Sequence, residues 1–314
     1  MPLRGSFDGT HRERVLEPDE TMTAVAGKIQ EVRSAVREAR RRGERVGLVP
    51  TLGALHAGHV SLVRAAKAEN AFVVVSLFVN PTQFGPGEDY ESYPRPREKD
   101  LAICRQEGVA LVFAPPTEEM YPAGFATTVH VAGLTEKMCG ASRPGHFDGV
   151  STVVAKLLGI VRPDAAYFGE KDAQQLAVVR QMARDLNLAV EIRACPLVRD
   201  ADGLATSSRN QHLSARERTS ALVLGRALAQ ARQRIEAGDC NAASVAEGVR
   251  RLVGDEPGVA LEYVAVVDPD TLADLERIED RALVALAARV GRTRLLDNVL
   301  LRNLRGGSTT LPAG

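Results

Sequence analysis

The sequence predicts an α/β protein, a doubly wound parallel sheet followed by a smaller C-terminal α+β domain. Two observations support this. Short runs of β-branched and aromatic residues recur without alternating apolar and polar positions, a pattern typical of strands buried on both faces. Helical patterns lie between these runs, as the crossover connections of a parallel sheet require. We therefore expect the N-terminal domain to be Rossmann-like.

The first element expected after Met22 is a helix. Ile29, Val32, Val36 and Ala39 recur at helical spacing, and the next glycine stands where a helix would end. Buried strands are then expected at residues 45–50, 72–79, 109–114, 165–168 and 190–195. Helices are expected between them at residues 60–69, 97–106, 149–161 and 173–186.

The pattern changes beyond Cys195, where a turn-rich segment precedes further helices and strands. Helices are expected at residues 214–236 and 241–253, and strands at residues 261–267, 282–287 and 293–301. These observations divide the chain into a mobile N-terminal extension (1–21), a Rossmann-like domain (22–197), a C-terminal α+β lid domain (198–305) and a tail (306–314).

Charge and cysteine usage exclude several classes of protein. Lys and Arg total 40, as do Asp and Glu, so we expect no overall attraction to nucleic acid or membranes. The four cysteines match neither a disulfide framework nor a zinc site, which indicates a reducing, cytoplasmic setting. The longest apolar run, residues 282–288, is far shorter than the roughly 20 residues of a membrane span.

The most specific motif follows the first buried strand. It reads His56-Ala57-Gly58-His59 and opens the next helix. Unpaired N–H groups and the helix dipole favour an anion such as phosphate at this position. Two imidazoles, which can be protonated near neutral pH, would stabilise the charge that grows as an α-phosphorus is attacked and pyrophosphate leaves. The alternative is a tight turn whose histidines only cap the helix; a zinc site is less favoured.

Two further polar segments follow strands, where an open α/β sheet places its ligands. Residues 169–172 include Lys171, a candidate cation for phosphates whose alternative is an ordinary surface lysine. Residues 205–210 offer serine hydroxyls and Arg209 to a polyphosphate, or form only a turn.

Amides and a cationic loop complete the candidate site. Asn80 and Gln83 leave the second buried strand and suit the recognition of hydroxyls and a carboxylate. Arg143 and His146 lie in a cationic loop. The sequence lacks a complete phosphate loop, dinucleotide fingerprint or nucleophile elbow.

Together, these segments resemble the pantothenate synthetase (pantoate:beta-alanine ligase) family of the HxGH nucleotidyltransferase superfamily. The resemblance covers residues 22–303 and rests on VPTLGALHAGH, FVNPTQF, SRPGHF, YFGEKDAQQL, DGLATSSRN and TRLLDN. It implies that ATP and pantoate form pantoyl adenylate and pyrophosphate, after which beta-alanine displaces AMP.

The resemblance also implies a role for individual residues. Catalysis would fall on His56, His59 and Lys171. ATP binding would fall on Leu52, Gly53, Ala54, Leu55, His56, Ala57, Gly58, His59, Gly169, Glu170, Lys171, Asp172, Val198, Thr206, Ser207, Ser208 and Arg209. Gln83 and Gln175 would hold pantoate, Gln83 would also line the beta-alanine site, and Asn80, Arg143 and His146 would belong to the same pocket. The family further implies Mg²⁺, with Asp100 as a candidate ligand, and a homodimer.

Three positions depart from the family pattern. Leu52 and Thr206 stand where methionine is frequent, and Lys99 stands where an acid often precedes Asp100. The first two affect adenine packing and the third affects the metal site.

Two other functions compete with this interpretation. One is an HxGH adenylyltransferase that transfers AMP to a phosphorylated precursor, although the amide-rich FVNPTQF segment has few cations for such an acceptor. The other is a nucleotide-binding regulator without activity, which the intact His56, His59, Lys171 and Arg209 disfavour.

Overall fold

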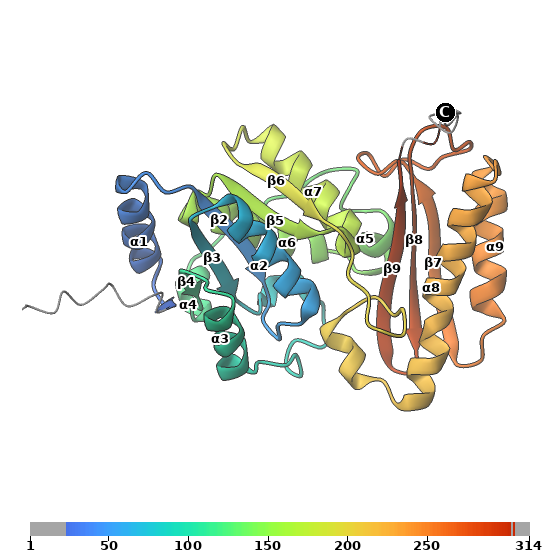
Figure 1. Cartoon of the computed structure of the whole chain (residues 1–314), viewed down its shortest axis with the longest axis horizontal. Helices are drawn as coiled ribbons and strands as arrows, with labels where there is room; N and C mark the ends of the chain where they lie inside the picture. The colour runs from blue at the N-terminus through green and yellow to red at the C-terminus, as the bar shows by residue number, and fades with distance from the viewer. Residues whose placement is uncertain (1–22, 303, 305–314) are drawn as a thin grey trace, which may run out of the picture.

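The computed structural model describes residues 23–302 and 304, which form two lobes (Figure 1). The N-terminal lobe contains a six-stranded sheet in the order β1-β4-β3-β2-β5-β6, and all its pairings are parallel. The strands are β1 (Ala24–Ala26), β2 (Val46–Thr51), β3 (Phe72–Leu77), β4 (Leu111–Phe113), β5 (Ala165–Gly169) and β6 (Glu191–Cys195). This is the predicted doubly wound sheet.

Alternate side chains of the central strands enter two apolar layers. Leu48 of β2 and Val74 of β3 pack against helices α1 (Ile29–Arg41), α6 (His146–Val161) and α7 (Ala173–Asp185). Val49 and Val75, on the opposite face, pack against α2 (Ala57–Glu69) and α3 (Arg97–Gln106). All four side chains are fully buried, which explains the continuous apolar runs in the sequence.

The C-terminal lobe is a three-stranded antiparallel sheet covered by two helices. Its strands are β7 (Val259–Val267), β8 (Ala282–Val290) and β9 (Thr293–Leu301), in that order. Helices α8 (Ala215–Glu236) and α9 (Ala242–Gly254) cover the face of the sheet that is turned away from the N-terminal lobe (Figure 1). The α8 helix begins with a capping box between Ser214 and Glu217, which fixes its first turn.

The other face of this small sheet packs on the N-terminal lobe. Leu283 and Ala285 of β8 belong to the same apolar cluster as α6 and α7. The predicted domain boundary between residues 197 and 198 falls just after β6. The division into separate domains stays a prediction, because this apolar cluster contains residues of both lobes.

Several elements differ from the sequence-based expectations. Strand β1 was not predicted, because three residues are too short to show a period. Strand β6 was predicted to be buried on both faces, which is wrong: its residues alternate between exposed and half-buried until Cys195, because β6 is an edge strand. Short helices α4 (Thr117–Met120) and α5 (Met138–Ser142) and the 3₁₀ turns η1 (Pro81–Gln83), η2 (Glu170–Asp172) and η3 (Ser208–His212) were also not predicted.

The predicted extension (1–21) and tail (306–314) lie outside the described residues. Within the described part of the chain, no helix is both long and apolar enough to span a membrane.

We predict opposite effects for two glycine substitutions in α6. A Cβ at Gly149 would clash with the Thr82 carbonyl oxygen of η1, whereas nothing lies within 4 Å of a Cβ at Gly159. Gly149→Ala should therefore lower the free energy of unfolding by about 1–3 kcal/mol through overpacking. Gly159→Ala should raise it by about 0.5–1 kcal/mol through helix propensity. Urea unfolding tests both, and equal effects would contradict the described contact between α6 and η1.

Candidate active site

A cavity of about 250 Å³ opens between the lobes, beside the ends of β2 and β5. Most of the predicted ligand-binding residues line it, namely Leu52, His56, Gly58, His59, Gln83, Arg143, His146, Gly169, Lys171, Asp172, Gln175, Val198, Thr206, Ser207, Ser208 and Arg209. The other predicted residues are not part of its lining, namely Gly53, Ala54, Leu55, Ala57, Asn80, Asp100 and Glu170. The fold therefore brings segments that are far apart in the sequence to one place.

The loop between β2 and α2 is held by a buried carboxylate. Asp100, which is 2 % exposed, accepts hydrogen bonds from the backbone N–H groups of Ala54 (2.9 Å) and Leu55 (2.8 Å). Gly53 has φ +96° and Ala54 has φ 51°, so the chain turns sharply here. The Asp100 carboxylate thus fixes where α2 begins.

The two motif histidines cap α2 and also line the cavity. His56 Nδ1 accepts a hydrogen bond from the Gly58 N–H (3.2 Å), and His59 Nδ1 accepts one from the His56 N–H (3.4 Å). The ring centroids lie 4.0 Å apart. Because Nδ1 of each ring is an acceptor, the neutral rings carry their proton on Nε2. The two histidines therefore cap the helix and also face the cavity, so the capping role does not exclude a role in ligand binding.

Both histidines are neutral at pH 7 in the chain by itself. Burial, together with the nearby Lys171 ammonium, lowers the pKa of His56 to about 4. Burial and then His56 lower the pKa of His59 to about 3. The expectation that these rings are protonated near neutral pH is therefore wrong for the chain alone. Each ring still offers one N–H donor to a phosphate oxygen.

The segment after β5 contributes a cation and an amide. Lys171 lines the cavity, and its Nζ lies 3.9 Å from Asp172. Gln174 is buried and engaged, since it donates to the carbonyl groups of Leu134 (2.8 Å) and Lys137 (2.7 Å). Gln175 also lines the cavity and has no side-chain hydrogen bond within the described residues. Of these two neighbouring glutamines, Gln175 is the one free to contact a ligand.

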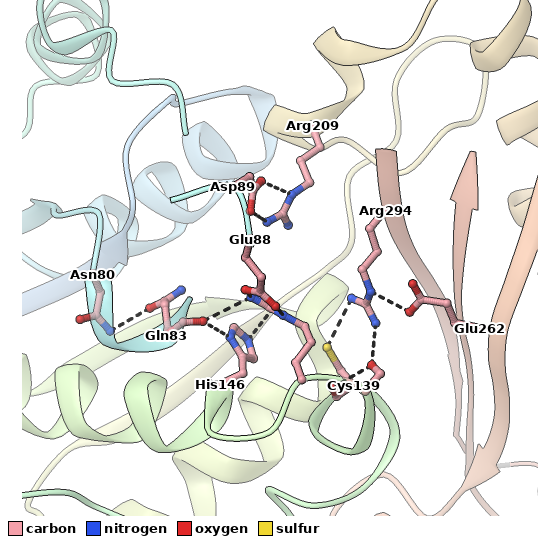
Figure 2. A network of polar contacts seen from close by, with 11 residues as sticks. Asn80, Gln83, Glu88, Asp89, Cys139, His146, Arg209, Glu262 and Arg294 are labelled. Carbon is pink, nitrogen blue, oxygen red and sulfur yellow. Dashed lines mark hydrogen bonds and ion pairs between the residues drawn. The ribbon is translucent and has the colours of Figure 1, made fainter. Parts of the chain in front are cut away.

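A network of amides and rings surrounds Gln83 (Figure 2). The buried Asn80 amide donates to Gln83 Oε1 (3.1 Å) and to the Gly149 carbonyl (3.1 Å). His146 bonds the Gln83 carbonyl at 2.7 Å, and burial lowers the pKa of His146 to about 4. Asn80 therefore supports Gln83 from outside the cavity, while Gln83 and His146 line it.

Two adjacent acids hold the two site arginines. Glu88 accepts from Arg143 Nε (2.7 Å), and Asp89 accepts from Arg209 Nε and Nη2, both at 2.9 Å. Figure 2 shows Glu88 and Asp89 on one loop, with Asp89 turned toward Arg209 and Glu88 toward the His146 side. The Arg209 guanidinium was expected to be available to polyphosphate, but in the structure it is paired with Asp89. Sequence reasoning missed both acids because ion pairs between residues 55 and 120 positions apart have no local pattern.

The hydroxyl groups after β6 are also engaged. Ser207 caps η3 by accepting from the Arg209 N–H (3.3 Å). Ser208 Oγ lies 3.3 Å from the Tyr93 hydroxyl, and Thr206 donates to Asp200 (2.6 Å). This segment is therefore a preformed polar wall of the cavity.

Comparisons with known proteins agree with this geometry. The family model described as pantoate-beta-alanine ligase matches residues 24–300. The chain belongs to this family. The resemblance predicted from the motifs is confirmed.

Relatives within the pantoate-beta-alanine ligase family match almost their whole length. Pantothenate synthetase of Thermoanaerobacter sp. (strain X514) is 52% identical over 276 residues, which are 88% of this chain and 98% of that protein. Pantothenate synthetase of Moorella thermoacetica is 55% identical over 273 residues, covering 87% and 96%.

Solved structures of family members share the fold. Pantothenate synthetase from Thermus thermophilus has a TM-score of 0.84 at 47% identity, covering 90% of this chain and 99% of that one. Pantoate-beta-alanine ligase from Francisella tularensis, complexed with beta-gamma ATP and beta-alanine, has a TM-score of 0.70 at 33% identity, covering 89% and 98%. The predicted fold class is confirmed.

The position of Asp100 does not suit the role of Mg²⁺ ligand that the family resemblance implies. Its two carboxylate oxygens already accept backbone N–H groups, and it is not part of the cavity lining. The described residues contain no group of three or more His, Cys, Asp or Glu side chains arranged for a metal ion. Asp100 therefore acts on the loop that leads to the histidines.

We predict that stability falls as the pH is lowered from about 6.5 to about 4. The pKa values of His56 and His59 in the folded chain, about 4 and 3, lie below the ordinary 6.5. The unfolded chain therefore binds more protons in this window, so stability rises with pH and is lost as pH falls. We expect each of these histidines to contribute a loss of about 1–3 kcal/mol, measured by urea unfolding at about pH 7 and pH 4.5.

Two variants isolate this effect from the titration of other groups. His59→Gln should reduce the pH slope of the unfolding free energy, whereas His212→Gln, at an exposed ring, should not. A pH slope that His59→Gln leaves unaltered would contradict the burial of a neutral His59.

Proposed function

We propose that this chain condenses pantoate with beta-alanine in two steps in the cavity between the lobes. The observation that carries the proposal is that one cavity joins the histidines of α2, Lys171 and the amides of Gln83 and Gln175. Cationic and N–H donors suit a triphosphate, and neutral amides suit a hydroxy acid. Family membership supports the same activity.

In the first step, a carboxylate oxygen of pantoate attacks the α-phosphorus of ATP, and the bond to pyrophosphate breaks. Nε2–H of His56 and of His59 donate to phosphate oxygens, and the Lys171 ammonium offsets the charge that grows there. Bound phosphate raises the pKa of these rings relative to the chain alone, because a nearby negative charge favours the imidazolium.

In the second step, the amine of beta-alanine attacks the acyl carbonyl of pantoyl adenylate. The new C–N bond forms, the C–O bond to AMP breaks, and the nitrogen loses a proton. A free carboxylate resists this attack because oxide is a poor leaving group, whereas AMP is a good one. The site therefore needs positioning and charge stabilisation rather than a covalent nucleophile.

The pairing of the arginines disfavours transfer of AMP to a phosphorylated acceptor. Near Gln83, the Arg143 guanidinium is neutralised by Glu88, so this end of the cavity offers little positive charge to a second phosphate. A carboxylate with hydroxyl groups suits it better.

Other expectations extend this proposal. Mg²⁺ enters with the ATP phosphates, because the described carboxylates do not form a ready site for it. We also propose a homodimer located in the cytoplasm, as the family resemblance and the cysteine usage imply.

We predict that labelled pyrophosphate exchanges into ATP when pantoate is present and beta-alanine is absent, because the adenylate forms before the amine reacts. Exchange that strictly requires beta-alanine, in a preparation that makes pantothenate, would overturn the two-step order. Absence of both exchange and pantothenate would overturn the proposed function.

The same assay tests Gln175. Gln175→Ala should weaken pantoate binding by about 1–3 kcal/mol, because ligand oxygens lose their partner in a buried site, and should leave ATP binding nearly unchanged. Gln181→Ala, on the outer part of the same helix with contacts to Asp185 and Arg184, is the matched control. An equal loss for ATP and pantoate would remove Gln175 from the pantoate site.

We predict that His59→Ala and Lys171→Ala each lower kcat at least about a hundredfold, because groups that stabilise a transition state typically contribute that much. Single-turnover AMP formation measures the effect, and thermal unfolding checks that each variant is folded. Near-normal turnover in a folded variant would remove that residue from the mechanism.

A further inference from the structure

Lys171 depends for its position on a contact from the other lobe. It lies in η2, three residues between β5 and α7. Asn298, on β9, is only 7% exposed and donates its Nδ2 to the backbone carbonyls of Glu170 (3.0 Å) and Lys171 (2.8 Å). Both N–H bonds of one amide nitrogen are thus used on consecutive residues of the same turn.

No other described side chain hydrogen bonds to the backbone of residues 169–172. The C-terminal lobe makes one further polar contact with this turn in the described structure, the Arg302–Glu170 ion pair (2.8 Å). The Arg302 side chain is 57% exposed. Exposed ion pairs contribute little to holding a segment. The Asn298 amide is therefore the main polar contact that fixes η2 against the small sheet.

Asn298 is itself held firmly. Its backbone N–H donates to the Asp297 carboxylate (2.8 Å), which also accepts two hydrogen bonds from Arg199 at 2.8 and 2.9 Å. Asp297 is almost completely buried. Arg199 in turn donates to the Gly203 carbonyl (3.0 Å) in the hairpin that leads to the Ser208 wall. Through Asn298 and Asp297, strand β9 thus contacts both η2 and the hairpin that contains Arg199.

We propose that Asn298 is a positioning residue that acts through Lys171, although it lies in the other lobe. The proposal rests on the proposed function, in which the Lys171 ammonium contacts ATP phosphates. A displacement of the backbone near 1 Å is enough to weaken such a contact strongly. Asn298 holds that backbone by donation, a task that aspartate, with no N–H, cannot perform.

The experiment is a double-mutant cycle read by ATP affinity. Asn298→Ala and Asn298→Asp are made in the parent chain and in Lys171→Ala, and calorimetry gives the Kd of ATP without pantoate. We expect about a tenfold weaker Kd in the parent background and less than a twofold change when Lys171 is absent. Asn241→Asp, at the cap of α9, is the control, because aspartate caps a helix as well as asparagine does.

Each outcome decides the role. The proposal is overturned if the substitution of Asn298 raises the Kd of ATP by the same factor in both backgrounds. It is also overturned if Asn298→Ala binds ATP with the Kd of the parent chain. If Asn298→Ala fails to fold, the cycle with the isosteric Asn298→Asp decides in its place. If the parent binds ATP but shows no pantoate-dependent exchange, the proposed function fails while the cycle still decides the role of Asn298. A parent that does not bind ATP overturns both.

Discussion

Strands β3 and β4 extend the sheet from β2 in one direction, and β5 and β6 extend it in the other. The connections that follow β2 and β5 therefore run away from each other at the carboxyl ends of these two strands. Neither connection fills the space between the strand ends. Everything at the site follows from this reversal of strand order. The turn after β2 brings His56 and His59 to the cavity, the turn after β5 brings Lys171, and the C-terminal lobe forms the remaining wall.

The site is organised by polar contacts that are satisfied before any substrate arrives. Asp100 fixes the turn into α2, Asn80 orients Gln83, and Glu88 and Asp89 hold the two arginines. Such supporting contacts keep reactive groups within the narrow range of positions that chemistry needs. Burial also has an electrostatic consequence, because it lowers the pKa values of the two histidines and keeps both rings neutral at pH 7 in the chain alone.

Local sequence patterns were sufficient to predict the elements whose bounds depend on neighbouring residues. Helix α3 and strand β9 have their predicted bounds, because apolar periodicity and turn residues mark both ends. The motif histidines were found because a helix N-terminus has a recognisable composition. The partners of Arg209 and the clamping role of Asp100 could not be found in this way, since each depends on a residue about 45 or more positions away. The protonation state of His59 depends on burial, which exists only after folding.

The contact between the lobes restricts how the C-terminal lobe can move. Leu283 and Ala285 of the small sheet pack into the core of the larger lobe, and Asn298 bonds the turn that carries Lys171. A swing of the whole C-terminal lobe about a hinge would expose this apolar surface to water and break those bonds at once. The loop of Glu88 and Asp89 is held to the cavity wall by two ion pairs, with Arg143 and Arg209. The contact between the lobes therefore opposes any movement of the C-terminal lobe as a whole, and the turn that carries Lys171 shares this restraint.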